Sequence, residues 1–227
     1  AALPNRIYGI MTNDLLISVP LFVFMGVMLQ KSKIAEELLE SMSMLMQNVR
    51  SGLTISVTIV GALLAASTGI VGATVVTMGL LSMPTMLKKG YSPSLASGTI
   101  CAAGTLGQII PPSIVLILLS DQISASYQQA QLALGNFSPD SVSVTDLFLG
   151  ALLPGIVLVI LYIFWQILNS YINPSSNPNK IIIKKKEDTF TIYKQVLKAL
   201  LPPLLLIIAV LGSILTGLAT PTESAGV

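Results

Sequence analysis

Between Ser51 and Ser120 the chain carries only two charged residues, Lys88 and Lys89. A soluble domain is charged at about a quarter of its positions, so a stretch of this length would lack the polar surface that water requires. Such sequences usually lie in the lipid bilayer. The whole chain is 53% hydrophobic and 10% charged, with a mean hydropathy of +0.82. We therefore expect an all-α integral membrane protein with several spans, and we exclude a soluble enzyme.

The residues that usually carry catalysis are scarce in this sequence. The chain has no histidine, which removes histidine-based catalysis, histidine metal sites and the easiest proton relay. Cys101 is the only cysteine, so neither an intrachain disulfide nor a thiolate metal cluster can form. The net charge of +2 is too small to indicate a nucleic acid partner. We predict a protein that is not an enzyme and needs no cofactor.

The first apolar run, from Leu15 to Leu29, is long enough with its flanks for one span. After Lys33 the pattern becomes that of an amphipathic helix. Its apolar stripe consists of Ile34, Leu38, Met42, Leu45, Met46 and Val49. Three glutamates lie towards its start and Arg50 lies at its end, an order that complements the helix dipole. We expect this helix to lie in the membrane interface without crossing the bilayer.

The segment 53–87 is too long for one comfortable span. As a single helix it would measure roughly 52 Å, against a hydrocarbon core of ~30 Å. Small and hydroxyl residues interrupt it at 65–74, and both ends are basic, at Arg50 and Lys88. A single crossing would put one basic end outside, against the positive-inside tendency. We predict a re-entrant helical hairpin with its tip at 67–69; two short crossing helices or one long tilted helix are the alternatives.

The next apolar stretch, from Leu95 to Leu119, is interrupted by GTLGQIIPPS at 104–113. Two glycines and two prolines break the hydrogen-bond ladder of a continuous helix. At membrane depth, the freed backbone groups are tolerated only where they are buried in protein or line a wet cavity. We predict a broken helix here; a glycine packing face with a proline kink is the alternative.

The remaining segments alternate between loops and spans. Asp121 to Asp146 is polar and lacks lysine and arginine, so we expect an outside loop, with Ser143 and Asp146 capping the next helix. Spans are expected over 147–168 and 199–218, joined by a basic cytoplasmic loop. Its lysines are Lys180, Lys184, Lys185, Lys186, Lys194 and Lys198. Thr220, Pro221 and Glu223 form a capping box for a further helix.

Together the hairpin tip and the broken helix predict a ligand site near the middle of the bilayer. Secondary transporters build such sites from discontinuous helices whose ends point at the ligand. Unwound carbonyls and hydroxyl oxygens suit a hard cation such as sodium, while helix N-termini favour anionic groups. A proton relay usually needs an ionisable residue at membrane depth, and these segments offer none. Sodium coupling is therefore the better hypothesis than proton coupling.

Two longer runs carry a resemblance to a known family. The runs GALLAASTGIVGATVVTMGLLSMPTMLKKGY and GTICAAGTLGQIIPPSIVLILLSDQ resemble the large membrane (DctM-like) subunit of tripartite ATP-independent periplasmic (TRAP) transporters. The DLFLGALLPG stretch and the TPTE motif strengthen the match, which covers Ile10 to Val227. Within this family the chain looks most similar to the branch labelled mannitol/chloroaromatic-compound type.

The resemblance implies an elevator-type, sodium-dependent importer of organic acids in the bacterial inner membrane. It implies two partners, a small membrane subunit and a soluble periplasmic binding protein. It also implies that the hairpin is the first of two, and that it forms the first sodium site with the broken helix. The sodium-site residues carried over are Ser67, Thr68, Gly69, Gly104, Thr105 and Gly107, with Pro112 and Ser113 on the substrate side.

On this reading the chain is the first half of an inverted-repeat transporter, divided into four parts. These are a span with the interfacial helix (1–52), the hairpin and broken helix (53–120), a periplasmic loop, span and basic loop (121–198), and a span with the start of the second repeat (199–227). The chain starts without methionine and stops where an apolar segment begins, so we expect an internal part of a longer protein. A receptor-independent sodium/dicarboxylate symporter of the divalent-anion type is the alternative; an intramembrane protease is disfavoured because histidine and intramembrane aspartate are lacking.

Overall fold

The computed structural model describes residues 2–12, 14–137, 141–177 and 189–226, and within these ranges the fold is helical without strands. The prediction of an all-α fold is confirmed. The α-helices are α1 (Ala2–Met11), α2 (Asp14–Lys31), α3 (Ile34–Leu45), α4 (Gly52–Thr68), α5 (Val71–Lys88), α6 (Pro93–Thr105), α7 (Ile114–Ala133), α8 (Val144–Ile172), α9 (Thr189–Leu215) and α10 (Pro221–Ala225), with short 3₁₀ turns η1 (Leu106–Gln108) and η2 (Pro174–Ser176).

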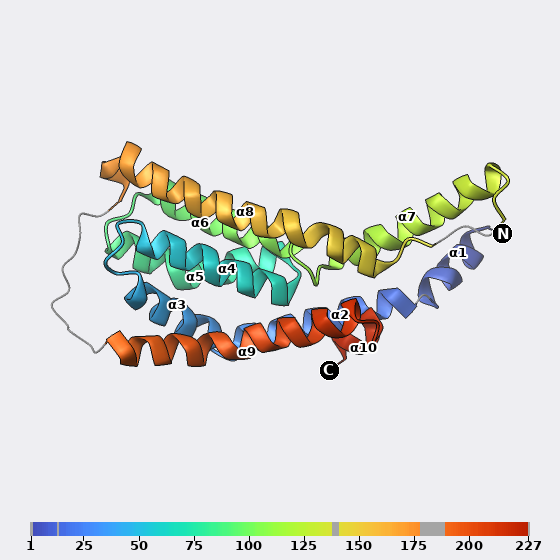
Figure 1. Ribbon diagram of the computed structural model, residues 1–227, viewed down its shortest axis with the longest axis horizontal. Helices are drawn as coiled ribbons and strands as arrows, with labels where there is room; N and C mark the ends of the chain where they lie inside the picture. Colours follow the sequence, from blue (N-terminus) through green and yellow to red (C-terminus); the bar gives the residue numbers. More distant parts are fainter. Residues whose placement is uncertain (1, 13, 138–140, 178–188, 227) are drawn as a thin grey trace.

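Helix α4 lies at the centre of the bundle and packs against α2, α3, α5, α6, α8 and α9. Figure 1 shows α8 along one side of the molecule and α9 along the other, with the α4 to α6 layer between them. Helix α1 and the far half of α7 project beyond the bundle at the same end. The two breaks in the chain, between α4 and α5 and between α6 and α7, therefore lie inside the bundle.

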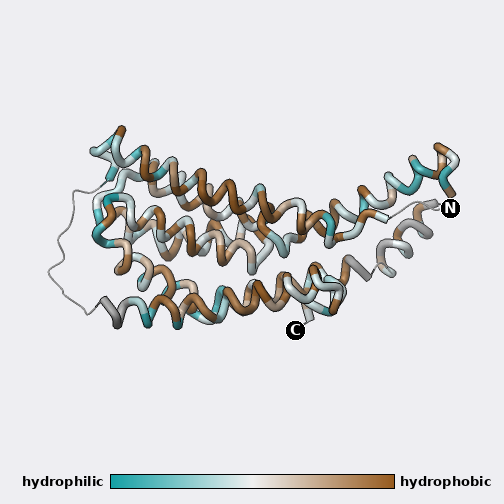
Figure 2. Tube along the Cα trace, viewed as in Figure 1, coloured by the Kyte–Doolittle hydropathy of each residue, from teal (hydrophilic) through white to brown (hydrophobic). Residues whose placement is uncertain are grey.

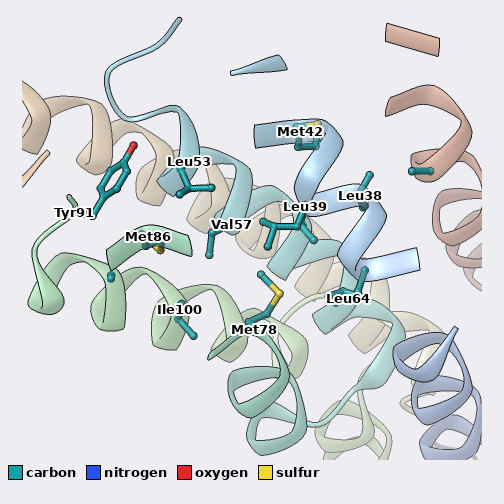
Figure 3. Close-up of a cluster of buried hydrophobic side chains, with 14 of the residues drawn as sticks. Leu38, Leu39, Met42, Leu53, Val57, Leu64, Met78, Met86, Tyr91 and Ile100 are labelled. Atoms are coloured by element: carbon teal, nitrogen blue, oxygen red, sulfur yellow. The ribbon is translucent and has the colours of Figure 1, made fainter. Parts of the chain in front are cut away.

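The largest buried cluster joins α3, α4, α5 and α6 (Figure 3). Its members include Leu38, Leu39, Met42, Leu53, Val57, Leu64, Met78, Met86, Tyr91 and Ile100. In a bilayer, close packing rather than escape from water holds helices together. The unbranched methionines fill irregular gaps between these helices. The cluster fixes the amphipathic helix α3 on the base of the α4–α5 pair, which keeps that pair in place.

The helical hairpin predicted for 53–87 is present as α4 and α5. Helix α4 ends because Gly69 adopts a left-handed conformation, with φ of 61°, and its amide donates to the Ala65 carbonyl at 3.0 Å. Ile70 is extended, and α5 begins at the next residue. At the other end, the Tyr91 hydroxyl donates to the Arg50 carbonyl at 3.3 Å. This bond holds the two basic ends of the hairpin together; entry and exit from one membrane face stays a prediction.

Three helices are long and apolar enough to cross a membrane: α5, α8 and the part of α9 from Tyr193 to Leu215. Helices α2 and α3 form a further candidate, bent by 55° at their junction, where Lys33 has a φ of 63°. Figure 2 shows apolar residues along most of α8 and α9, with hydrophilic residues gathered at the helix ends. This count refers to the described residues, and it agrees with the expectation of a multi-span protein.

Several boundaries differ from the sequence expectations. The segment 121–146, predicted as an outside loop, is not a loop over its first half, because α7 continues as helix to Ala133; its location outside the membrane stays a prediction. That expectation was based on polarity, but the glutamine, alanine and serine residues of this segment are compatible with an exposed helix. The amphipathic helix stops at Leu45, before Met46 and Val49. The four lysines from 180 to 186 lie outside the described residues.

Both predicted capping boxes are confirmed. Ser143 caps α8, with Asp146 bonded back to its amide, and Thr220 caps α10 in the same way with Glu223. Hydrogen bonds from the Thr220 amide and hydroxyl hold the pKa of the exposed Glu223 below its ordinary value of 4.5. Glu223 therefore has a local structural role at the start of α10.

Candidate functional site

The two helix breaks meet, and one hydrogen bond connects them directly. The Gln108 side chain at the α6–α7 break donates through Nε2 to the Gly69 carbonyl at the hairpin tip, at 2.9 Å. A Cβ atom added to Gly69 would lie 3.6 Å from both the Pro112 carbonyl oxygen and the Ile114 amide nitrogen. The first residue of α7 therefore lies beside the end of α4.

At the hairpin tip the hydroxyl groups are buried and turned towards backbone of their own segment. Ser67 and Thr68 are 1% and 4% exposed. The Ser67 hydroxyl donates to the Leu63 carbonyl at 2.9 Å. The Thr68 and Thr74 hydroxyls lie 2.6 Å apart, and Thr74 also bonds the Ile70 carbonyl, at 3.0 Å. A hydroxyl that donates its proton to a carbonyl keeps lone pairs for a cation.

The facing break is held closed by Ser113. This fully buried side chain donates to the Gln108 carbonyl at 2.9 Å and accepts from the Leu116 amide at 3.4 Å. It therefore caps the N-terminus of α7 and fixes the loop that carries Pro112. Gly107 lies against α4, where an added Cβ would be 2.8 Å from the Ala65 carbonyl oxygen. Only glycine permits this approach of η1 to the last turn of α4.

Helix α2 supports the hairpin tip from the other side. A Cβ on the buried Gly26 would lie 3.2 Å from the Ser67 carbonyl oxygen and closer still to the Thr68 Cα. One turn later, Gln30 donates to the Ala73 carbonyl in the first turn of α5, at 3.2 Å. The tip is thus enclosed between α2 and the α6–α7 break.

The structure separates the eight sequence-predicted residues into two groups. One region holds Ser67, Thr68, Gly69, Gly107, Pro112 and Ser113. Gly104 is buried against α5, where an added Cβ would lie 3.2 Å from the Val75 Cα. Thr105 is exposed on α6, and its hydroxyl donates to the Ala102 carbonyl at 2.7 Å.

Backbone dipoles dominate the electrostatics of this region. The carbonyl end of α4 and the amide ends of α5 and α7 converge at the tip. A helix C-terminus carries a partial negative charge and an N-terminus a partial positive charge. Among the described residues no group of three or more His, Cys, Asp or Glu side chains could hold a metal ion. The arrangement suits a hard monovalent cation at the carbonyl end and an anionic group at the amide ends.

Sequence reasoning missed four residues of this region: Gly26, Gln30, Thr74 and Gln108. Gln108 had a detectable signal, because it is a long amide side chain in an otherwise apolar run between two glycines and two prolines. Gly26 and Gln30 had none, since they lie on a separate span whose position beside the tip is a tertiary feature.

Comparison with known proteins identifies a family and several relatives. The family model for the DctM component of the tripartite ATP-independent periplasmic transporter matches residues 1–227. The C4-dicarboxylate TRAP transporter large permease protein DctM of Vibrio cholerae is 31% identical over 217 residues, covering 93% of this chain and 42% of the relative. Its Pseudomonas aeruginosa counterpart is 28% identical over 217 residues, covering 93% of this chain and 44% of the relative.

A relative with a different named substrate is also similar. The ectoine/5-hydroxyectoine TRAP transporter large permease protein UehC of Ruegeria pomeroyi is 25% identical over 210 residues, covering 92% of this chain and 44% of the relative. The chain therefore spans less than half the length of each of these three relatives. The match over the whole chain shows that this chain belongs to the family of the DctM component of tripartite ATP-independent periplasmic transporters.

Proposed function

We propose that the chain forms one half of the large permease of a sodium-coupled importer of organic acids in the bacterial inner membrane. The observation that carries this proposal is the junction between the two helix breaks, where Gln108 bonds the Gly69 carbonyl at 2.9 Å. A break of this kind exposes backbone carbonyls within an apolar bundle, where they need a partner. Because a carbonyl oxygen has two lone pairs, the Gly69 carbonyl can accept from Gln108 and still bind a coupling ion.

The chemistry of the junction favours sodium over a proton. Its side chains are hydroxyls and amides, namely Ser67, Thr68, Thr74, Gln108 and Ser113. These groups do not titrate near neutral pH, so they cannot relay protons. They offer oxygen ligands to a hard cation. Thr105 belongs to the proposal as well, because its exposed hydroxyl oxygen is available to a ligand outside the described bundle.

The relatives support a proposal about the substrate and the partners. Two of them are named for C4-dicarboxylates and one for ectoine and 5-hydroxyectoine, all of which carry carboxylate groups. We propose an organic acid whose carboxylate is attracted by the N-termini of α5 and α7. We further propose that a periplasmic binding protein delivers it and that a small membrane subunit accompanies the permease. The family match favours this arrangement over a receptor-independent symporter.

The test is transport by the protein reconstituted in liposomes with its small subunit and binding protein. We expect uptake of an organic acid. This uptake should require an inward sodium gradient and the binding protein, and ATP should not change its rate. Uptake at full rate without sodium, or without the binding protein, would contradict the proposal.

The variant Gln108→Leu tests the junction itself. It leaves the Gly69 carbonyl without its donor, which typically costs about 1–3 kcal/mol for a buried polar group. The expected result is a sodium requirement for half-maximal uptake raised about tenfold, the equivalent of ~1.4 kcal/mol. The matched control is Gln122→Leu, an exposed glutamine two turns into α7, which should behave as wild type. Equal sodium dependence in both variants would place the ion elsewhere.

A further inference from the structure

A cavity of about 370 Å³ lies between the amphipathic helix α3 and the first half of α9. Figure 1 shows these two helices side by side at one edge of the bundle. The polar residues that line the cavity are Glu37, Glu40 and Ser41 of α3 and Gln195 and Lys198 of α9. This cavity is separate from the junction of the two helix breaks, and no part of the transport proposal uses it.

The two walls of the cavity carry charges of opposite sign. Glu37 and Glu40 are three positions apart, so they share one face of α3, while Lys198 belongs to the α9 wall. Within the described part of the chain, no ion pair joins Lys198 to either glutamate. The two carboxylates and the one ammonium group therefore have their charges available to a ligand. A ligand that matches both walls carries an ammonium group and an acidic group.

The cavity lies where α9 begins its candidate membrane span. That span starts at Tyr193, which is exposed, as aromatic residues at a membrane surface often are. On the same face of α9, Leu201 and Leu205 follow Lys198 at i+3 and i+7 and are 47% and 54% exposed. The charged cavity is thus followed by an apolar helix face. A ligand that uses both combines a charged head with an apolar tail.

We propose that this cavity binds the headgroup of a phospholipid with a primary ammonium group, namely phosphatidylethanolamine. The lipid ammonium donates hydrogen bonds to the two glutamates, and Lys198 binds the lipid phosphate. Ser41 and Gln195 offer a hydroxyl and an amide as further donors to the phosphate. The acyl chains lie along the exposed leucines of α9. The volume of the cavity is within the range of roughly 300–1,000 Å³ that small-molecule sites occupy.

Other ligands satisfy only part of this pattern. Phosphatidylglycerol has a phosphate but no ammonium group, so the two glutamates repel it. Phosphatidylcholine has a quaternary ammonium without an N–H group, so it cannot donate hydrogen bonds to the carboxylates. A divalent cation would bind the glutamates but would repel Lys198. Soluble phosphoethanolamine has both charges but no tail for the apolar face of α9.

Native mass spectrometry of the full-length permease tests this assignment. The purified protein is equilibrated with equal amounts of phosphatidylethanolamine, phosphatidylglycerol and phosphatidylcholine, and the lipids that stay bound are identified. We expect phosphatidylethanolamine to be retained with a preference of about tenfold, and the double variant Glu37→Gln/Glu40→Gln to lose that preference. The matched control is Glu36→Gln, an exposed glutamate outside the cavity lining, which should keep it. Equal retention of the three lipids by the unmodified protein, or an unchanged preference in the double variant, would overturn the proposal.

Charge reversal in the cavity gives a second test in the same assay. Glu40→Lys should shift the preference to phosphatidylglycerol, because the walls then carry one carboxylate and two ammonium groups. Lys198→Gln should weaken retention of phosphatidylethanolamine, whereas Lys194→Gln, an exposed lysine outside the cavity lining, should not. Unchanged lipid preference in both Glu40→Lys and Lys198→Gln would contradict the proposal. Displacement of the lipid by an equal concentration of soluble phosphoethanolamine would show that the ligand is not a lipid.

Discussion

Helices α4 and α8 are both strongly apolar, yet α4 is almost entirely buried in the bundle and α8 is mostly exposed. Of the 17 residues in α4, 15 are buried, and they include five hydroxyl side chains. Of the 29 residues in α8, five are buried, and large side chains such as Leu153 (72%) and Phe164 (60%) are exposed. Apolar character alone therefore does not tell an inner helix from a peripheral one.

The difference is in the size and chemistry of the side chains. Helix α4 has small and hydroxyl residues on every face, and Gly61 lets α6 approach so closely that an added Cβ would lie 2.6 Å from the Ala103 Cβ. Helix α8 has large aliphatic and aromatic side chains that fit lipid or a loosely packed partner. Small residues mark the centre of a membrane bundle, because they permit helix contact on all sides.

The largest expected effect is on membrane topology. On a Cys101→Ala background, cysteines replacing Arg50 and Lys88 should both resist a membrane-impermeant thiol reagent applied from the periplasm, because the α4–α5 hairpin has both ends on one side. For α8, a cysteine at Ser141 should react and one at Asn173 should not, because this helix crosses. Periplasmic labelling of only one of the two hairpin ends would rule the hairpin out.

Replacing a glycine by leucine should destabilise the protein much more in α4 than in α8. Gly61→Leu must displace Ala103. We therefore expect the free energy of unfolding to fall by about 1–3 kcal/mol or more, with a low yield of folded protein. At Gly150 in α8 an added Cβ would meet no atom within 4 Å, so Gly150→Leu should leave the melting temperature nearly unchanged. Size-exclusion profiles and thermal unfolding of purified protein measure both. Similar losses for the two variants would mean that α8 is as tightly packed as α4.

Removal of a hydroxyl should show a smaller effect that depends on position. Thr68→Val removes the buried contact with Thr74. We expect a total free-energy loss of about 1–3 kcal/mol, divided between protein stability and sodium affinity. Thr105→Val removes an exposed hydroxyl, so it should shift the sodium dependence of uptake without lowering the melting temperature. Wild-type sodium dependence in both variants would show that neither threonine contributes to the ion site.

The smallest expected effect concerns the cap of α10, outside both helices. Since its hydrogen bonds lower the pKa of Glu223, they stabilise the cap at neutral pH, and this stabilisation is lost as the pH falls through a value below 4.5. An NMR titration of the Glu223 carboxyl carbon should give a pKa below 4.5, and Thr220→Ala should return it to about the ordinary value. An unshifted pKa in the unmodified protein would mean that the cap does not form in solution.

The hairpin, the broken helix and both capping boxes could be predicted because each is encoded locally. Gly69 ends α4, the GTLGQIIPPS run ends α6, and Thr220 and Glu223 are three residues apart. The extent of α7 could not be predicted in the same way. Polarity indicates exposure to water, but an exposed segment of good helix formers can be either loop or helix.

By itself the sequence determined that the chain is a helical membrane protein with two interrupted elements. Helix-breaking glycines and prolines and long uncharged runs are local features, so they can be read without knowing which segments pack together. Only the tertiary structure decided that Gln108 bonds Gly69, that Gly26 and Gln30 of α2 support the tip, and that Thr105 lies on an exposed face. The reason is physical: which faces of several similarly apolar helices meet depends on the close fit of small residues brought together from distant segments.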